Sequence, residues 1–123
     1  MGGRNAYIIK TDAAGNEEWS RILGGAGDDY ARDLTTDGTN IIAAVNYNYG
    51  SGTGDLYLVS LFADGTTDWT KHYTTTDREA NFMVHTASDG YVVSGTTQNW
   101  LDEGDSGDDW MRYFLLKADK TDG

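Results

Sequence analysis

Two acidic, glycine-rich stretches contain the residues of this sequence that could bind a metal ion. Residues 24–31 read GGAGDDYA and fit the calcium-binding nonapeptide pattern GGxGxDxUx. In that pattern glycines leave backbone carbonyls accessible, and an aspartate completes a shell of hard oxygen ligands. Such patterns bind calcium as tandem copies, and this sequence holds one copy. The favoured interpretation is therefore a connector in which an aspartate caps a turn.

The second stretch, residues 101–109, is the better calcium candidate. Five carboxylates within eight residues repel one another, and a cation would relieve that repulsion. The candidate ligands are Asp102, Asp105, Asp108 and Asp109. Their spacing lacks the glutamate that closes an EF-hand loop, so a solvated acidic loop is favoured over a calcium site. We expect no other cofactor.

Aromatic residues beside the polar loops could stack on sugar rings. Tyr49, Trp100 and Trp110, with Tyr47 nearby, stand next to asparagine, aspartate or glycine residues. An aromatic face bordered by polar groups is one way to bind a glycan, so these residues are candidate ligand contacts. The favoured alternative is that they pack between sheets or at a subunit contact.

Side chains that often serve in catalysis are present, but their spacing does not indicate catalysis. His72 and His85 have no surrounding metal-binding motif. No serine lies in a nucleophile elbow. Adjacent carboxylates such as Glu17 and Glu18 point to opposite faces of a strand, whereas glycosidases need two carboxyl groups that converge across a cleft. We expect no enzyme, and a hydrolase is the least favoured function.

Composition excludes several classes of partner. The chain of 123 residues is long enough for one domain, and it carries 20 acidic and 9 basic residues, a net charge of -11. That charge argues against nucleic acid and against an anionic membrane surface as partners. The absence of cysteine excludes disulfides and thiolate chemistry. The first ten residues lack the apolar core of a signal peptide, and the compartment stays undetermined.

Short strand signals separated by turn residues fill the chain, and no stretch shows a helical period. Strands rich in aromatic and β-branched residues are expected about every ten residues. This spacing predicts an all-β fold. The nine expected strands span residues 6–11, 16–23, 30–36, 40–47, 57–62, 67–73, 81–86, 91–97 and 112–118.

These strands recur as an internal repeat. Residues 6–19 return as residues 56–69, and a third copy begins at Phe114. A single domain would thus hold repeats over residues 6–55 and 56–113 and the start of another over 114–123. Four strand signals in one unit predict antiparallel four-stranded sheets like the blades of a propeller, with a compact β-sandwich as the alternative.

One residue of the repeat is suited to joining neighbouring sheets. Trp19 and Trp69 each follow a turn glycine by four positions, and a tryptophan there can lie across the next sheet while its indole N–H finds a carbonyl. Tyr7, Tyr57 and Phe114 occupy matching strand positions. We expect these five residues to dock sheets on one another.

Two segments carry a resemblance to a known family. Residues 10–31 (KTDAAGNEEWSRILGGAGDDYA) and 88–97 (SDGYVVSGTT) resemble bacterial and archaeal β-propeller repeats, and more distantly the tryptophan-docking repeats of quinoprotein-like propellers. The second copy departs from the pattern, with Thr74-Thr75 in place of the Gly-Gly pair. The resemblance implies an extracytoplasmic protein without enzymatic activity.

The strand count bears on function. Propellers typically close with about four to eight blades, whereas this sequence supplies a half-blade (6–23), a full blade (30–73) and three strands of another (81–118). We therefore expect a structural or binding module that completes its fold as a homo-oligomer. The alternative is a carbohydrate- or calcium-binding module.

Overall fold

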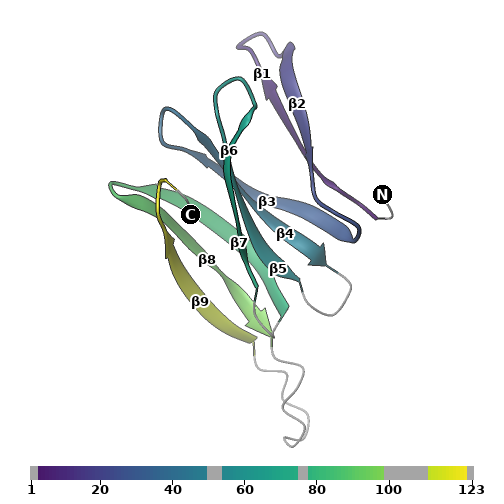
Figure 1. Ribbon diagram of the computed structural model, residues 1–123, viewed down its shortest axis with the longest axis vertical. Helices are drawn as coiled ribbons and strands as arrows, with labels where there is room; N and C mark the ends of the chain where they lie inside the picture. The colour runs from purple at the N-terminus through teal and green to yellow at the C-terminus, as the bar shows by residue number, and fades with distance from the viewer. Residues whose placement is uncertain (1–2, 50–53, 75–77, 99–110, 122–123) are drawn as a thin grey trace, which may run out of the picture.

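The alternation of apolar and polar residues produces strands throughout the described part of the chain. The computed structural model describes residues 3–49, 54–74, 78–98 and 111–121, and its regular structure is all β (Figure 1). The all-β fold expected from the sequence is thus confirmed. The strands are β1 (Ala6–Thr11), β2 (Glu17–Leu23), β3 (Asp28–Thr36), β4 (Ile41–Tyr49), β5 (Asp55–Leu61), β6 (Thr67–Tyr73), β7 (Arg78–Ala87), β8 (Gly90–Gln98) and β9 (Met111–Ala118).

The strands form three antiparallel sheets in chain order. β1 and β2 form a hairpin, the N-terminal sheet; β3–β4–β5–β6 form the central sheet; and β7–β8–β9 form the C-terminal sheet. The predicted division into two, four and three strands is therefore present, including a sheet of four strands. Three strands begin two or three residues earlier than the sequence suggested, at Asp28, Asp55 and Arg78, because these residues already pair with the neighbouring strands β4 and β8.

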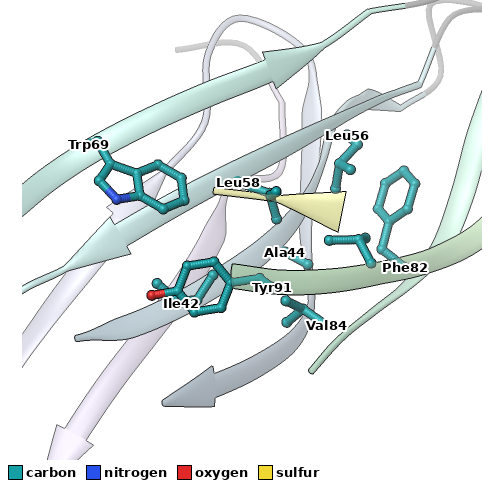
Figure 2. Packing of buried hydrophobic residues seen from close by; sticks show 10 residues of the cluster. Ile42, Ala44, Leu56, Leu58, Trp69, Phe82, Val84 and Tyr91 are labelled. Carbon is teal, nitrogen blue, oxygen red and sulfur yellow. The ribbon is translucent and has the colours of Figure 1, made fainter. Parts of the chain in front are cut away.

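The sheets stack face to face, with the central sheet in the middle (Figure 1). One apolar cluster joins its first face to the N-terminal sheet: Ala6, Ile8, Ala43, Val45, Val59 and Leu61. A second joins its other face to the C-terminal sheet: Ile42, Ala44, Leu56, Leu58, Trp69, Phe82, Val84, Tyr91, Val93 and Ala118 (Figure 2). A two-layer sandwich has one such interface, whereas the central sheet here is buried on both faces.

The two outer faces of the stack remain uncovered by described residues. Tyr7, Ile9 and Ile22 are exposed on the N-terminal sheet. Met83, Tyr113 and Leu115 are exposed on the C-terminal sheet, with Tyr113 at 88% and Leu115 at 76%. Successive side chains of a strand point to opposite faces, so these residues lie opposite the buried ones.

The outermost strands of each sheet have an open edge among the described residues, and two of them, β1 and β9, correspond to an inner strand of the central sheet. Among the described residues, β1 pairs only with β2, and β9 pairs only with β8. The corresponding strand of the central sheet, β5, pairs with β4 on one side and β6 on the other. Unpaired edges of this kind are templates for further strand pairing.

Candidate functional site

The tryptophans predicted to dock sheets on one another both reach the neighbouring sheet. Trp19, half-buried on β2, donates its indole N–H to the carbonyl of Ala63 at 2.9 Å. Ala63 lies in the turn that joins β5 to β6. The indole ring of Trp19 lies so close to Gly65 that a Cβ on Gly65 would be 2.7 Å from Trp19 Cδ2. Since Gly65 also has a φ of 83°, glycine is required at this docking turn for two reasons.

Trp69 repeats this arrangement one sheet further along the stack. It lies on β6, is buried, and donates its indole N–H to the carbonyl of Lys120 at 2.9 Å. Lys120 follows β9 as Ala63 follows β5, two residues after the last strand residue in each case. The ring lies beside Tyr91, with 6.1 Å between centroids (Figure 2). One residue type thus holds two successive interfaces through the same contact.

The other three docking candidates occupy equivalent positions in successive copies of the repeat. Tyr57 pairs with Val45 of β4, and Phe114 pairs with Gly95 of β8. Phe114 packs on the second apolar cluster, with its ring 6.0 Å from that of Phe82. Tyr57 is half-buried beside the first cluster. Tyr7, fifty residues before Tyr57, is 53% exposed and makes no such contact within the described chain.

Backbone hydrogen bonds join successive sheets at the same repeat position. The amide of Asp29 donates to the carbonyl of Arg4 at 2.6 Å, and the amide of Glu79 donates to the carbonyl of Gly54 at 2.7 Å. The two donors, and likewise the two acceptors, are fifty residues apart. The buried Asn46 adds a hydrogen bond from Nδ2 to the Glu79 carbonyl at 3.0 Å. Sheet stacking is therefore fixed by polar contacts as well as by apolar area.

A tyrosine–aspartate hydrogen bond, which the sequence did not reveal, also joins the central and C-terminal sheets. The hydroxyl of Tyr91 donates to Asp37 Oδ2 at 2.6 Å. Hydrogen bonds from the Asn40 amide and from Tyr91 lower the pKa of Asp37. Burial and the same hydrogen bond raise the pKa of Tyr91. The sequence signal, a tyrosine after Asp89-Gly90, could not identify the partner.

We expect Tyr91→Phe to lower the free energy of unfolding by about 1 kcal/mol at neutral pH, because it removes this hydrogen bond. The folded-state pKa of Asp37 lies below its usual value. Its contribution is therefore present above the unfolded-state pKa and is lost as pH falls through the folded-state pKa. The difference between wild type and variant, measured by urea denaturation, should shrink from pH 6 to pH 3. A constant difference would contradict this coupling.

The GGAGDDYA segment has a structural explanation that needs no metal. Asp29 is buried, and its two carboxylate oxygens accept the amides of Gly25 and Asn48, each at 2.8 Å. A Cβ at Gly24 would lie 2.1 Å from the same carboxylate. Asn48 has a φ of 56°, a conformation that asparagine tolerates. The favoured interpretation, an aspartate that caps a turn, describes these contacts.

The remaining candidate ligands fall mostly outside the described residues. Asp102, Asp105, Asp108, Asp109, Trp100 and Trp110 lie in the undescribed segment 99–110, and only the backbone of Tyr49 is described, in β4. Elsewhere in the described ranges, no group of three or more histidine and carboxylate side chains could hold a metal ion. Calcium binding and glycan binding through these residues stay predictions.

One histidine belongs to an aromatic cluster that the sequence did not predict. His72 stacks on Tyr57 with 4.1 Å between ring centroids, and Tyr47 meets His72 edge-on at 4.9 Å. These residues end β4, begin β5 and end β6, so strand pairing brings them together. Only the strand register could have revealed the cluster. His72 here is a packing residue.

A pocket opens between the central and C-terminal sheets beside β9. It has a volume of about 310 Å³ and is lined by Leu56, Tyr73, Glu79, Thr97, Phe114, Leu115 and Leu116. Its lining is mostly apolar and holds one carboxylate, that of Glu79. The pocket marks incomplete packing at the open edge of β9.

Comparisons with protein-family models and with curated proteins identify no relative of this chain. The described residues contain no helix that is long and apolar enough to cross a membrane.

Proposed function

We propose that this protein is a non-catalytic structural module that assembles with further copies of itself into a propeller-like stack of sheets. The observation that carries the proposal is the exposure of large apolar side chains on the two outer faces. Within the chain, each internal face is covered by a neighbouring sheet through a docked tryptophan. The outer faces have the same kinds of residue, and no described residue covers them.

The character of these faces supports association. The middle of one outer face consists of Tyr7, Ile9, Ser20 and Ile22, and the middle of the other consists of Met83, Val92, Ser94, Tyr113 and Leu115. None of these residues is charged, although the chain carries 20 acidic residues; one charged side chain, that of Lys117, borders the second patch beside Val92. Exposed uncharged patches of this kind mark interaction surfaces. Because the two faces differ, the contact is head-to-tail, a geometry that builds closed rings or open arrays.

The oligomeric mass measured by light scattering over a range of concentrations tests the proposal. We expect a mass that is a multiple of 13.5 kDa and that falls on dilution. A chain that stays monomeric at every concentration would refute self-assembly.

Ile9→Lys should weaken association at least about tenfold. Ile9 is 48% exposed in one copy, and a lysine in a covered apolar face costs more than the roughly 1.4 kcal/mol that corresponds to tenfold. Phe62→Lys is the matched control, since Phe62 is 43% exposed in the turn after β5, away from both outer faces. Equal effects of the two variants would mean that association depends on net charge rather than on this face.

A further inference from the structure

We propose that β9 occupies, on β8 of its own chain, the place that β1 of a second copy takes in the assembly. This inference rests on the proposed self-assembly and specifies its contact: the β1–β2 hairpin of one copy replaces β9 of another. Within a single copy, β9 would then be an internal substitute that must leave before the copies join.

The register of the strands shows that β1 and β9 are copies of the same strand. On the central sheet, Val45 of β4 pairs with Tyr57 of β5. Fifty residues later than Val45, Gly95 of β8 pairs with Phe114 of β9. Fifty residues earlier than Tyr57 stands Tyr7 of β1. Tyr7 and Ile9 therefore correspond to Phe114 and Leu116, and the free edge of β1 is the one that would face β8.

β9 is held less firmly than its counterpart β5. Val59 of β5 is fully buried, whereas the corresponding β9 residue Leu116 is only half-buried; Ala118, the counterpart of Leu61, is buried. The pocket of about 310 Å³ opens beside β9, so its inner side chains lack neighbours there. β9 also has no partner strand on its outer edge among the described residues. Release of β9 therefore breaks fewer packing contacts than release of β5 would.

The incoming hairpin would gain burial that it lacks in a single copy. Tyr7 and Ile9, 53% and 48% exposed, would turn toward the central sheet of the first copy, where Phe114 and Leu116 now lie. Gly95 leaves room for an aromatic ring at that point, since a Cβ there would lie 2.8 Å from Phe114. β2 would then supply the fourth strand that the C-terminal sheet lacks.

The hairpin also carries an unused docking turn. The turn before Gly15 matches the turn before Gly65 on which Trp19 docks: φ is 87° and 83°, and each glycine amide donates to the residue three positions before it. Gly65 is covered by Trp19, but a Cβ at Gly15 would meet no atom within 4 Å. In the exchanged arrangement Trp69, released from the turn after β9, would dock on the Gly15 turn of the second copy.

A disulfide across β8 and β9 tests whether β9 must leave. Ser94 pairs with Leu115, and the native chain has no cysteine, so Ser94→Cys with Leu115→Cys adds one defined cross-link. We expect the oxidised variant to lose self-association in light scattering and the reduced variant to regain it. Association that is unchanged by oxidation would overturn the exchange.

A second cross-link detects the exchanged contact directly. Val92 of β8 now pairs with Lys117 of β9, and Lys10 holds the same position in β1 as Lys117 holds in β9. In the exchanged arrangement Val92 of one copy would therefore pair with Lys10 of the other. Within one chain Val92 and Lys10 belong to sheets on opposite sides of the central sheet. We expect Lys10→Cys with Val92→Cys to form covalent oligomers on oxidation. Lys10→Cys with Phe62→Cys is the control and should not.

The outcomes separate the exchange from self-assembly itself. Wild-type oligomers, together with no Lys10–Val92 cross-link and no effect of the β8–β9 disulfide, would overturn the exchange and leave self-assembly standing. A wild type that is monomeric at all concentrations would refute both.

Discussion

Replacing Trp69 with alanine is expected to lower the free energy of unfolding by about 3–5 kcal/mol, the range for truncating a buried aromatic side chain. Trp69 is only 9% exposed, belongs to the apolar cluster between the central and C-terminal sheets, and donates its indole N–H to the Lys120 carbonyl. The substitution therefore removes apolar area and a hydrogen bond together. Urea denaturation at one fixed protein concentration measures the loss, because association changes the apparent stability.

Two further variants identify the source of that loss. Trp69→Phe keeps an aromatic ring but lacks the N–H donor, so it should cost about 1–2 kcal/mol. Trp19→Ala removes the equivalent contact at the other interface and should cost less than Trp69→Ala, because Trp19 is only half-buried. A loss below about 1 kcal/mol for Trp69→Ala would mean that tryptophan docking does not hold the sheets together.

Replacing Asp29 with alanine should lower the free energy of unfolding by about 2–4 kcal/mol, since an unsatisfied buried amide costs about 1–3 kcal/mol. The variant removes the acceptors of the Gly25 and Asn48 amides. The connector between β2 and β3 and the end of β4 would both lose their fixed conformation. Thermal and urea unfolding measure the effect.

The neighbouring carboxylate supplies the control. Asp28→Ala should cost less than about 1 kcal/mol, because Asp28 accepts the exposed amide of Arg4, whereas the amides that Asp29 accepts are partly buried. The calcium hypothesis for residues 24–31 predicts a different pattern. If Asp29 served chiefly as a metal ligand, the loss in Asp29→Ala would appear with calcium and vanish with a chelator. We expect the same loss in both conditions.

Strand positions could be predicted from this sequence because each local signal agrees with the fold. Turn glycines such as Gly15 and Gly65 have positive φ, and aromatic and β-branched residues fill the strands between turns. The repeated tryptophans predicted contacts between sheets, and both reach a neighbouring turn. Such features depend on residues close in sequence or repeated at a fixed interval.

The contacts that could not be predicted join residues without a repeat signal. Tyr91 and Asp37 are 54 positions apart, and a tyrosine in a strand has no preferred partner until the sheets are stacked. His72, Tyr57 and Tyr47 meet only through strand register. An aspartate of residues 24–31 was predicted to cap a turn, but the sequence did not show that Asp29 would also accept the amide of Asn48 on β4. Each depends on geometry that the whole fold creates.

The two apolar clusters share no residue, and each is confined to one interface of the central sheet. Stability in such a stack is close to a sum of each sheet's own term and one coupling term for each neighbouring pair, as in a linear chain of units. In a single copy the end sheets are coupled on one side only, so in the monomer they should open first and independently. The central sheet, coupled on both sides, sets the slowest amide hydrogen exchange and the last cooperative unit to unfold.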